Sequence, residues 1–458
     1  MSINLTGSND DVEATDALAR EVPDEEQMSR GSLAMAWYGV VSAMFFVYIG
    51  AVLAVAYGTV NALIGLALAI IVYGVINSVI TKYAINNRTT VAQFSRTILG
   101  SGGSAIATII FALVAIYYAV FEGSIVAYAF QTAFGGEWWM WVLIVVIYST
   151  PLVIGGVRRF LDKLNGWLLP LYWGGLIAAV IWASVQYGVT DKWLTQAPEA
   201  ALPFASGGPG WLATFSAYLG VMILMMFTMD YASLGKKADM KFHRTVTFGW
   251  VFYVFAYGVN ALVGIFLTFT IDGLEASETG VAGGLVSMMG LWGLLLVWVS
   301  QTRINTANYY LGAANLKAFF DRVFRANIPS IVFVIIGSLI IFLLMLLPIV
   351  QYILVALAWQ GVLVTAWVGI ALAHILMTKD EHGELGTIAD TKYHAFNGSG
   401  VLTWVIATVI GVIFLQLPVI APDLAGVGTS WGPIVTVLTA AGLYAILYKG
   451  NKKTALKA

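Results

Sequence analysis

The sequence contains no cysteine, and only 10% of its 458 residues are charged. Without cysteine the chain forms no disulfide bond and performs no thiol chemistry. A net charge of −1 does not provide the basic surface with which proteins bind nucleic acids. Motifs for a catalytic nucleophile, a zinc site or a phosphate-binding loop are also missing. We therefore expect neither an enzyme nor a bound cofactor or metal.

Hydrophobic residues, in contrast, make up 60% of the chain. Because soluble domains have about 25% charged residues, this composition is typical of an integral membrane protein that is embedded in a lipid bilayer. A helix needs about 20 apolar residues to cross a bilayer. Twelve segments of the sequence meet this condition: 33–57, 60–81, 104–134, 138–156, 165–187, 211–234, 246–271, 282–312, 329–347, 349–378, 400–421 and 430–448.

The basic residues are distributed unevenly between the two sides of these segments. If the N-terminus is cytoplasmic, every Lys and Arg except Lys192 and Arg303 lies in a cytoplasmic tail or connection. Cytoplasmic loops of membrane proteins collect basic residues in this way. The sequence therefore predicts a protein of the cytoplasmic membrane with both termini in the cytoplasm.

Two ionisable residues lie deep inside predicted helices, Glu122 in the third and Arg303 in the eighth. A charge in hydrocarbon is so costly that it normally faces a cavity or a partner, which makes both residues functional candidates. Tyr118 precedes Glu122 by one helical turn and shares its face. An aromatic ring beside a carboxylate suits a flat ligand that carries N–H donors. Alternatively, Glu122 only neutralises Arg303 across the bundle and fixes the register of the helices.

The eighth segment also contains an unusually polar run, SQTRINTAN at 300–308. Its hydroxyl and amide oxygens have the chemistry that binds an alkali cation or a polar solute. The same side chains also suit hydrogen bonds between packed helices. The polar residues concerned are Ser300, Thr302, Asn305, Thr306 and Asn308.

Glycines mark possible breaks in the first and sixth segments. Broken membrane helices expose backbone groups for substrate and ion binding, and breaks at corresponding places in two halves of a chain indicate such a site. We expect Gly39 and Gly220 to permit these breaks. Asp230, near the cytoplasmic end of the sixth segment, is expected to hold a gate by pairing with Lys236 or Lys237.

Four segments, in this order, resemble the nucleobase:cation symporter-1 family of purine, cytosine, allantoin and hydantoin permeases. They are AWYGVVSAM (36–44), NRTTVAQFSRTILGSGGS (87–104), MDYASLGKKAD (229–239) and LGAANL (311–316). The resemblance covers ten predicted helices and implies a leucine-transporter-like fold, an all-α membrane protein with two inverted five-helix repeats, two peripheral helices and alternating access. The predicted units are a disordered cytoplasmic tail (1–30), a transport core (31–378), a cytoplasmic loop (379–399), the peripheral helices (400–448) and a cytoplasmic tail (449–458).

The resemblance also implies roles for individual residues. Tyr118 falls where the family stacks an aromatic ring on the substrate, and Glu122 falls where some members hydrogen-bond the substrate ring. Glu122 would accept hydrogen bonds from substrate N–H groups or carry a coupled proton. Asn305 would form hydrogen bonds with further polar groups of the substrate ring. Ser42 and the backbone of the broken helix near it would complete the pocket.

Three departures from the family pattern bear on substrate and ion. Tyr118 stands where the family usually has a tryptophan. Val221 or Met222 stands where the family often has a second aromatic residue, which weakens the resemblance to a purine or cytosine carrier. The hydroxyl residues that bind sodium in the eighth helix of sodium-coupled members are replaced by a run with a fixed cation. A fixed cation repels sodium strongly over a few ångströms, so Arg303 is expected to replace the ion. The run reads Ser300, Gln301, Thr302, Arg303.

The first hypothesis is a secondary transporter that imports a nucleobase or a related small heterocycle by cation symport, with protons favoured over sodium. A second hypothesis keeps the fold and changes the ligand to an amino acid or another polar solute, whose carboxylate Glu122 would disfavour. A third is a membrane receptor that transports nothing, in which the buried polar residues only stabilise the bundle.

Overall fold

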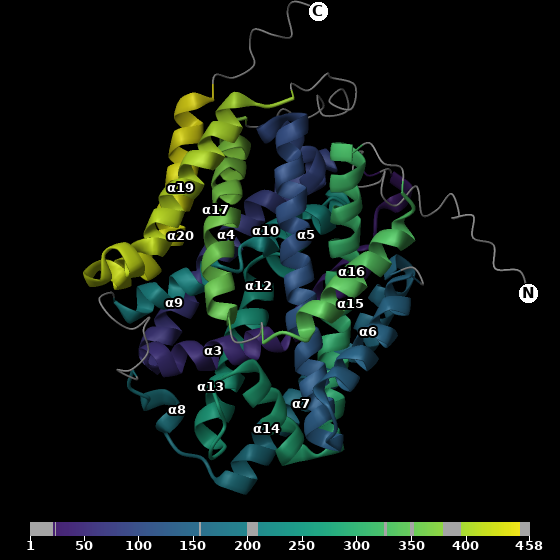
Figure 1. Cartoon of the computed structure of the whole chain (residues 1–458), viewed down its shortest axis with the longest axis vertical. Helices are drawn as coiled ribbons and strands as arrows, with labels where there is room; N and C mark the ends of the chain where they lie inside the picture. Colours follow the sequence, from purple (N-terminus) through teal and green to yellow (C-terminus); the bar gives the residue numbers. More distant parts are fainter. Residues whose placement is uncertain are drawn as a thin grey trace, which may run out of the picture.

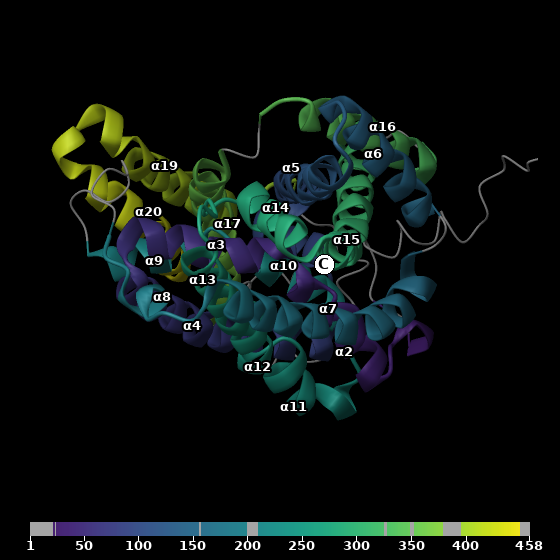
Figure 2. The ribbon, with the colours of Figure 1, turned by 90° about the horizontal axis from the view of Figure 1, so that it is seen from below.

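The computed structural model describes residues 22–448 apart from residue 23 and residues 155–156, 199–208, 325–327, 349–351 and 379–394. Within this part of the chain every regular element is a helix. The helices form one elongated bundle, seen from two directions in Figures 1 and 2. The all-α class predicted from the sequence is therefore confirmed. Most of the predicted tails, 1–30 and 449–458, and of the predicted loop, 379–399, lies outside the described residues.

The α-helices of the first half are α2 (Arg30–Tyr38), α3 (Met44–Tyr57), α4 (Thr59–Asn87), α5 (Val91–Phe134), α6 (Trp138–Ile154), α7 (Val157–Tyr187) and α8 (Lys192–Thr195). The next group is α9 (Gly210–Leu219), α10 (Ile223–Ala232), α11 (Met240–Phe242), α12 (Trp250–Tyr253), α13 (Asn260–Thr270), α14 (Glu278–Met289), α15 (Leu291–Phe324), α16 (Ser330–Met345) and α17 (Ile353–Met377). The last two are α19 (Gly398–Ile420) and α20 (Ala425–Leu447). A 3-10 turn, η2 (Val40–Ser42), follows α2, and two π-helical turns, η4 (His243–Thr247) and η5 (Val254–Val259), flank α12.

Seven of the described helices are long and apolar enough to cross a membrane, or nine if each of two bent pairs counts as one span. Helices α6 and α16 are apolar but shorter, with 17 and 16 residues. Helix α15 has 34 residues and carries the polar run. Length and composition therefore support a multi-pass membrane protein without confirming the number twelve.

Two predicted segment boundaries are wrong. The eighth segment, 282–312, joins the end of α14 to α15, which continues to Phe324. The two helices are separated by Gly290, whose φ of 60° is favourable for glycine and ends α14. The third segment, 104–134, is only part of α5, which already begins at Val91.

The two bent pairs are the predicted broken helices. Helix α2 with η2 meets α3 at 43°, and α9 meets α10 at 41°. Gly39 (φ −55°, ψ −36°) and Gly220 (φ −58°, ψ −22°) lie at the ends of α2 and α9 but have helical dihedral angles. The first helix instead leaves the helical region at Ala43, with ψ 123°. Gly220 has a packing role, because a Cβ there would lie 2.5 Å from the Leu357 carbonyl oxygen of α17.

Helix α5 is kinked at Gly100, whose φ is 84°. A kink leaves backbone groups without partners inside the helix, and the residues before α19 supply these partners. The Gly102 N–H donates to the Ala395 carbonyl at 2.6 Å, and the Asn397 N–H donates to the Leu99 carbonyl at 2.9 Å. The residues just before α19 are thus hydrogen-bonded to α5 at its kink. Helices α19 and α20 also pack on each other and on α17 at one side of the bundle (Figure 1).

The described part of the predicted N-terminal tail packs against the bundle. Val22 is 2% exposed and donates its N–H to the Arg88 carbonyl at 3.2 Å. Asp24 forms an ion pair with the Arg88 guanidinium, and the Met28 N–H donates to the Leu234 carbonyl at 2.9 Å. The residues just before α2 therefore connect the end of α4 to the segment that follows α10.

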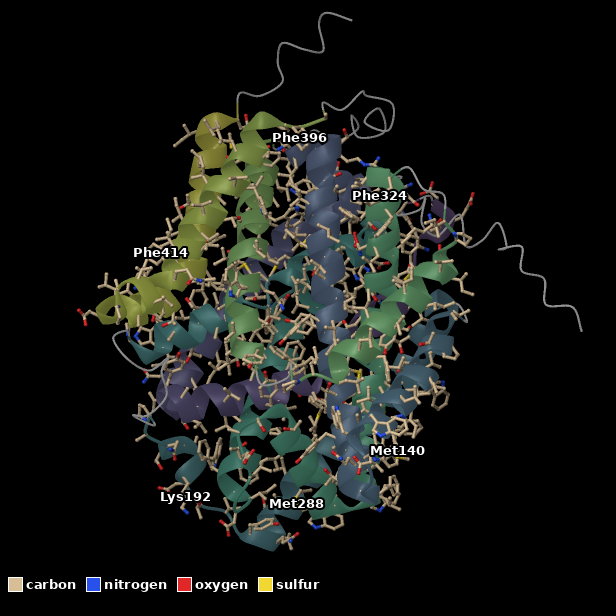
Figure 3. The ribbon with its side chains drawn as sticks, viewed as in Figure 1. Met140, Lys192, Met288, Phe324, Phe396 and Phe414 are labelled. Carbon is tan, nitrogen blue, oxygen red and sulfur yellow. The ribbon has the colours of Figure 1, made fainter. Side chains whose placement is uncertain are left out.

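The outside of the bundle is strongly apolar. Trp167, Val185 and Ile446 are 82%, 81% and 76% exposed, and Figure 3 shows side chains that project from the outer helices along the whole bundle. A soluble monomer rarely exposes so many large apolar side chains. Together with the composition, this outer surface is that of a protein surrounded by lipid.

Candidate functional site

The break in the first helix is tied to α15 by two consecutive residues. The Ser300 hydroxyl donates to the Ser42 carbonyl, and the Ser42 hydroxyl donates to the Gly39 carbonyl at 2.8 Å. The side-chain oxygen of Gln301 accepts the N–H of Met44 at 2.9 Å. Met44 is the first residue of α3, and its N–H has no partner inside that helix. Ser300 and Gln301 therefore satisfy backbone groups that the break exposes.

The other end of the Gln301 amide donates to the carboxylate of Glu122 on α5. Glu122 is 1% exposed and Gln301 is completely buried. A buried carboxylate that accepts an N–H donor makes a stronger hydrogen bond than a neutral pair does. One side chain thus joins the candidate substrate residue Glu122 to the N-terminus of α3.

Asn260, the first residue of α13, holds the same break from another side. Its side-chain N–H donates to the Val41 carbonyl at 2.7 Å, and its side-chain oxygen accepts the Tyr172 hydroxyl of α7 at 2.9 Å. Tyr172 interacts electrostatically with both Arg303 and Glu122. Arg303 is 1% exposed. The two buried charges that the sequence singles out therefore lie in the same region, beside the first break.

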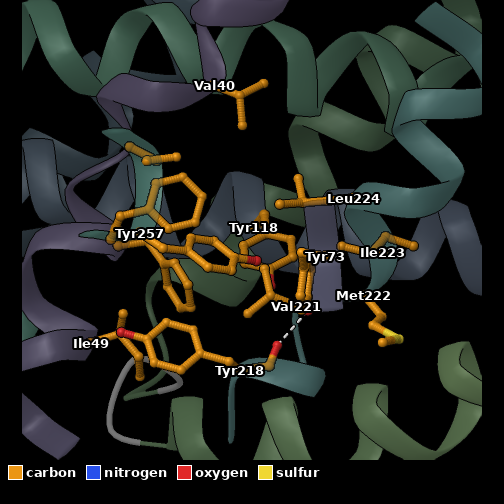
Figure 4. Packing of buried hydrophobic residues seen from close by; sticks show 14 of the residues in the cluster. Val40, Ile49, Tyr73, Tyr118, Tyr218, Val221, Met222, Ile223, Leu224 and Tyr257 are labelled. Carbon is orange, nitrogen blue, oxygen red and sulfur yellow. Dashed lines mark hydrogen bonds between the residues drawn. The ribbon is translucent and has the colours of Figure 1, made fainter. Parts of the chain in front are cut away.

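The second break lies against a cluster of tyrosine rings. The Tyr218 carbonyl, near the end of α9, accepts hydrogen bonds from the Tyr73 hydroxyl and from the Val221 N–H. The rings of Tyr73 and Tyr257 are 5.1 Å apart, and so are the rings of Tyr218 and Tyr257. Figure 4 shows Tyr118 among these rings. Helix α5 therefore presents Glu122 to the first break and Tyr118 to rings beside both breaks, because the Phe45 ring of α3 lies 6.0 Å from the Tyr118 ring.

Tyr118 and Asn305 each carry a buried polar atom that a ligand can reach only inside the bundle. Among the described residues, neither the Tyr118 hydroxyl nor the Asn305 side-chain oxygen has a hydrogen-bond partner, although the two residues are only 7% and 2% exposed. The side-chain nitrogen of Asn305 would lie 3.4 Å from a Cβ at Gly123, so Asn305 faces α5 next to Glu122. Buried polar atoms without a partner are costly, and a ligand with a polar edge could satisfy both.

Val221 and Met222, the residues at the second break, are 2% and 1% exposed. In Figure 4 Val221 lies by the Tyr73 and Tyr118 rings, whereas the Met222 side chain points away from them. The sequence left open which of the two faces the site. The structure favours Val221 as the apolar counterpart of Tyr118.

The structure does not bring the predicted ion-coupling residues together as one set. The Thr302 hydroxyl lies 3.1 Å from the Tyr148 hydroxyl of α6, whereas Ser300 faces the first break. Residues that are two positions apart on a helix, such as Ser300 and Thr302, are separated by about 200° of rotation. Their side chains therefore point to nearly opposite sides of α15. Arg303, three residues after Ser300, is on the same side as Ser300. Ser300 and Thr302 thus face different helices in this structure, and a common role of the two residues in ion coupling stays a prediction.

Asp230 connects helices, but not through the partners predicted for it. Its carboxylate accepts the N–H of Val91, the first residue of α5, at 2.7 Å. Lys236 and Lys237 are exposed, and within the described chain neither is the hydrogen-bond partner of Asp230. The end of α10 is thus held to the start of α5 by a carboxylate at a helix N-terminus, where negative charge is favourable.

A cavity of about 520 Å³ lies on the side of the second break towards α8. Its walls come from α3, α9, α13, α17, α19 and α20 and from residues 274–276, and they include Leu53, Ala213 and Pro433. Leu357, whose carbonyl approaches Gly220, also lines it. On the opposite side of the site, Trp37 of α2 packs against Tyr231 and Phe248 at 5.5 and 5.0 Å between ring centroids. The structure thus has space on one side of the breaks and packed rings on the other.

Several residues at the site were not predicted from the sequence. Gln301 lies in the polar run and could have been considered with its neighbours, but nothing local shows that it bridges two other helices. Asn260, Tyr73, Tyr172 and Tyr257 occur in ordinary apolar segments. Tyr257 lies in η5, and π-helical turns often mark functional sites, but they have no simple sequence signal.

No protein-family model matches the chain, and a search of curated proteins finds no significant match. Solved structures do match. Mhp1, a nucleobase-cation-symport-1 family transporter in a closed conformation with bromovinylhydantoin bound, has a TM-score of 0.70 and 14% identity, over 92% of this chain and 93% of that one. The chain has the fold of a nucleobase-cation-symport-1 transporter. The resemblance seen in the sequence is confirmed at the level of the fold.

Other transporters share this fold at lower similarity. A sodium-coupled sialic acid symporter in a substrate-bound outward-open state matches with a TM-score of 0.58 and 10% identity, over 94% of this chain and 91% of that one. A manganese transporter of Eremococcus coleocola matches with a TM-score of 0.55 and 16% identity, over 91% and 94% of the two chains. The predicted leucine-transporter-like architecture is thus shared with carriers of quite different solutes.

Proposed function

We propose that this protein is a secondary transporter that imports a small planar heterocycle, of the nucleobase, hydantoin or allantoin class, together with a cation. One observation carries the proposal. Tyr118 and Glu122 lie one turn apart on α5. Glu122 is linked to the first break through Gln301, and Tyr118 lies between the Phe45 ring of α3 and the tyrosine rings at the second break (Figure 4). A ligand bound between them would touch both hinges of an alternating-access fold.

The chemistry of the site suits a flat ring with polar edges. Glu122 offers a carboxylate to ring N–H groups, Asn305 offers an amide, and Tyr118 offers an aromatic face and a hydroxyl. Val221 provides an apolar surface by the tyrosine rings. The fold shared with Mhp1, whose structure contains a hydantoin derivative, supports the same ligand class. An amino acid would place its carboxylate near Glu122, which like-charge repulsion disfavours.

The transport cycle follows from the two sides of the site. The substrate enters through the cavity bounded by α3, α9 and α17 and binds between the breaks. Exit on the other side requires Trp37 of α2 to separate from Tyr231 and Phe248. It also requires the end of α10, held by Asp230, to move from the start of α5. Binding energy that differs between the two states shifts their populations.

The coupling ion in this proposal is a proton. The Ser42 carbonyl, a potential cation ligand, already accepts the Ser300 hydroxyl, and the buried guanidinium of Arg303 lies in the same region. A fixed positive charge this close repels sodium. Glu122 would carry the proton, because it is the buried carboxylate nearest to the first break.

The membrane orientation in this proposal places both termini in the cytoplasm of the host cell, at its cytoplasmic membrane. Lys192 lies at one end of the bundle, and Phe396 lies at the other (Figure 3). The basic residues Arg88 and Arg244 belong to the end opposite Lys192, where Arg244 donates to the Ser78 carbonyl at 3.0 Å. The positive-inside rule places that end in the cytoplasm.

Uptake into proteoliposomes tests the proposal. Radiolabelled cytosine, hypoxanthine, uracil, allantoin and hydantoin are supplied separately, each with an inward proton gradient or an inward sodium gradient. We expect uptake of at least one compound under the proton gradient alone, and its loss in Glu122→Gln. Uptake driven only by sodium would contradict the choice of ion. Uptake of none of the five compounds would contradict the heterocycle.

A further inference from the structure

Gln301 occupies an unusual position in the bundle, because its single amide group connects three helices. It belongs to α15, its oxygen accepts the Met44 N–H at the start of α3, and its nitrogen donates to Glu122 on α5. Ser300, the neighbouring residue, contacts the same oxygen with its hydroxyl at 3.4 Å. Gln301 is 0% exposed, so these bonds do not compete with bulk water.

The hydrogen bond of this amide to Met44 depends on its hydrogen bond to Glu122. A substrate N–H or a proton that binds at the Glu122 oxygen contacted by Gln301 withdraws negative charge from it and so weakens the hydrogen bond from the amide. Where the new group takes the position of the amide N–H, the amide rotates or shifts, because a buried N–H without a partner is costly. Rotation moves the amide oxygen away from the Met44 N–H. The N-terminus of α3 would then lose the group that caps it.

The position of Met44 makes this loss consequential. Helix α2 is connected to α3 only through residues 39–43, where the chain bends by 43°. The buried face of α2, formed by Leu33, Ala34 and Trp37, packs against other helices of the core. A change in the bonds at Met44 therefore acts directly on the hinge about which α2 would move.

We propose that Gln301 is the positioning residue that transmits the state of Glu122 to the hinge of the first helix. The inference rests on the transport function proposed above for the identity of what binds at Glu122. The link itself rests on the hydrogen bonds of Gln301. In this arrangement the uncharged side chain of Gln301 connects α15 to the first break.

A cysteine-accessibility experiment tests the link without any substrate. The chain has no cysteine of its own, so Ala34→Cys introduces one reporter on the buried face of α2, at a residue that is 5% exposed. The rate of maleimide labelling of the purified protein then measures how often α2 separates from the core. Gln301→Met keeps the length of the side chain and removes the amide. We expect it to raise the labelling rate about tenfold, the effect of losing roughly one buried hydrogen bond at the hinge.

Asn315→Leu is the matched control. Asn315 is also a buried amide on α15, but it donates to the Leu311 carbonyl of its own helix at 2.9 Å. Its replacement removes a buried amide from the same helix without affecting the first break. We expect Asn315→Leu to leave the labelling rate within about a factor of two of the reporter protein, since distant sites act independently.

An exchange of the two side chains separates a specific link from a general loss of stability. Gln301→Glu alone places two carboxylates together, and we expect fast labelling. In the double variant Glu122→Gln/Gln301→Glu, the carboxylate at position 301 accepts both the Met44 N–H and the amide at position 122. The link is rebuilt with its direction reversed, and labelling should return to within about threefold of the reporter protein, as a coupled pair predicts.

The outcomes distinguish this inference from the proposed function. An unchanged rate in Gln301→Met, or a double variant that labels as fast as Gln301→Glu alone, would overturn the inference, whatever the uptake assay shows. The absence of heterocycle uptake by the wild-type protein would instead refute the proposed substrate, because labelling is measured without substrate. If Gln301→Met is not obtained as a folded protein, the comparison of Gln301→Glu with the double variant decides the question.

Discussion

The carboxylate of Asp230 accepts the backbone N–H of Val91 at 2.7 Å. The end of α10 therefore caps the start of α5. Helix α5 carries both Tyr118 and Glu122 in its second half. A movement of α10 must therefore either break this bond or carry the start of α5 with it. Asp230 is therefore a point at which a broken helix is bonded to the helix that bears the site.

Asp230→Ala should weaken the closed side of the protein. The substitution leaves the Val91 N–H without its acceptor, and loss of a side-chain cap or a similar hydrogen bond costs about 1 kcal/mol. We expect a lower thermal unfolding temperature in detergent and faster labelling of the Ala34→Cys reporter. Asp230→Asn is the control, because it keeps an oxygen acceptor and should lie closer to the wild type. Equal behaviour of Ala and Asn at this position would argue against the cap.

Glu122→Gln should abolish most of the transport while the fold persists. A carboxylate that accepts substrate N–H groups contributes about 1.5–3 kcal/mol per charged hydrogen bond, or roughly 10- to 100-fold in binding. The measurement is substrate binding and proton-driven uptake by the purified variant. Glu137→Gln is the matched substitution at an exposed site between α5 and α6, and it should transport like the wild type. Normal uptake by Glu122→Gln would remove Glu122 from the site.

Tyr118 should contribute mainly through its ring. Tyr118→Phe keeps the aromatic face and loses only a hydroxyl that has no partner within the described chain, whereas Tyr118→Ala loses the face as well. Aromatic stacking contributes about 0.5–1.5 kcal/mol beyond the area buried, so we expect the alanine variant to bind substrate less tightly than the phenylalanine variant. The control is Tyr352→Ala, at a tyrosine that is 56% exposed. A phenylalanine variant as weak as the alanine variant would mean that the hydroxyl, and not the ring, holds the ligand.

Gly264→Ala tests the close approach of α13 to the first helix. A Cβ at Gly264 would lie 1.7 Å from the Val47 carbonyl oxygen, so the two backbones must separate. Overpacking of this kind usually costs about 1–3 kcal/mol or more, and the unfolding temperature should fall markedly. Gly442→Ala on α20 is the control, since nothing lies within 4 Å of its added Cβ. Similar unfolding temperatures for the two variants would contradict the packing of α3 on α13.

Composition and helical periodicity predict much of this fold. The apolar segments give the helices, and the spacing of Tyr118 and Glu122 predicts that they share a face of α5, because this follows from local geometry. The same geometry predicts that Ser300 and Thr302 face different sides of α15, because side chains two residues apart on a helix diverge. The boundary at Gly290 was missed since α14 and α15 are both apolar next to it.

The bonds that hold the site could not be predicted in the same way. Gln301 contacts residues 257 and 179 positions away in the sequence, and Asn260 bonds a carbonyl 219 positions away. Such pairs depend on how the helices are placed in three dimensions, which a single sequence does not record. The sequence therefore identified the candidate ligand residues and missed the residues that position them.

The kink at Gly100 also has a consequence for the order in which the protein is made. The partners of the backbone groups around it, Ala395 and Asn397, leave the ribosome almost 300 residues after it. Until they arrive, the Gly102 N–H and the Leu99 carbonyl must bond to water, to lipid headgroups or to the membrane-insertion machinery. The helix that carries the candidate site is thus completed by residues synthesised almost 300 positions later, and a nascent chain released before residue 395 would contain an unfinished α5.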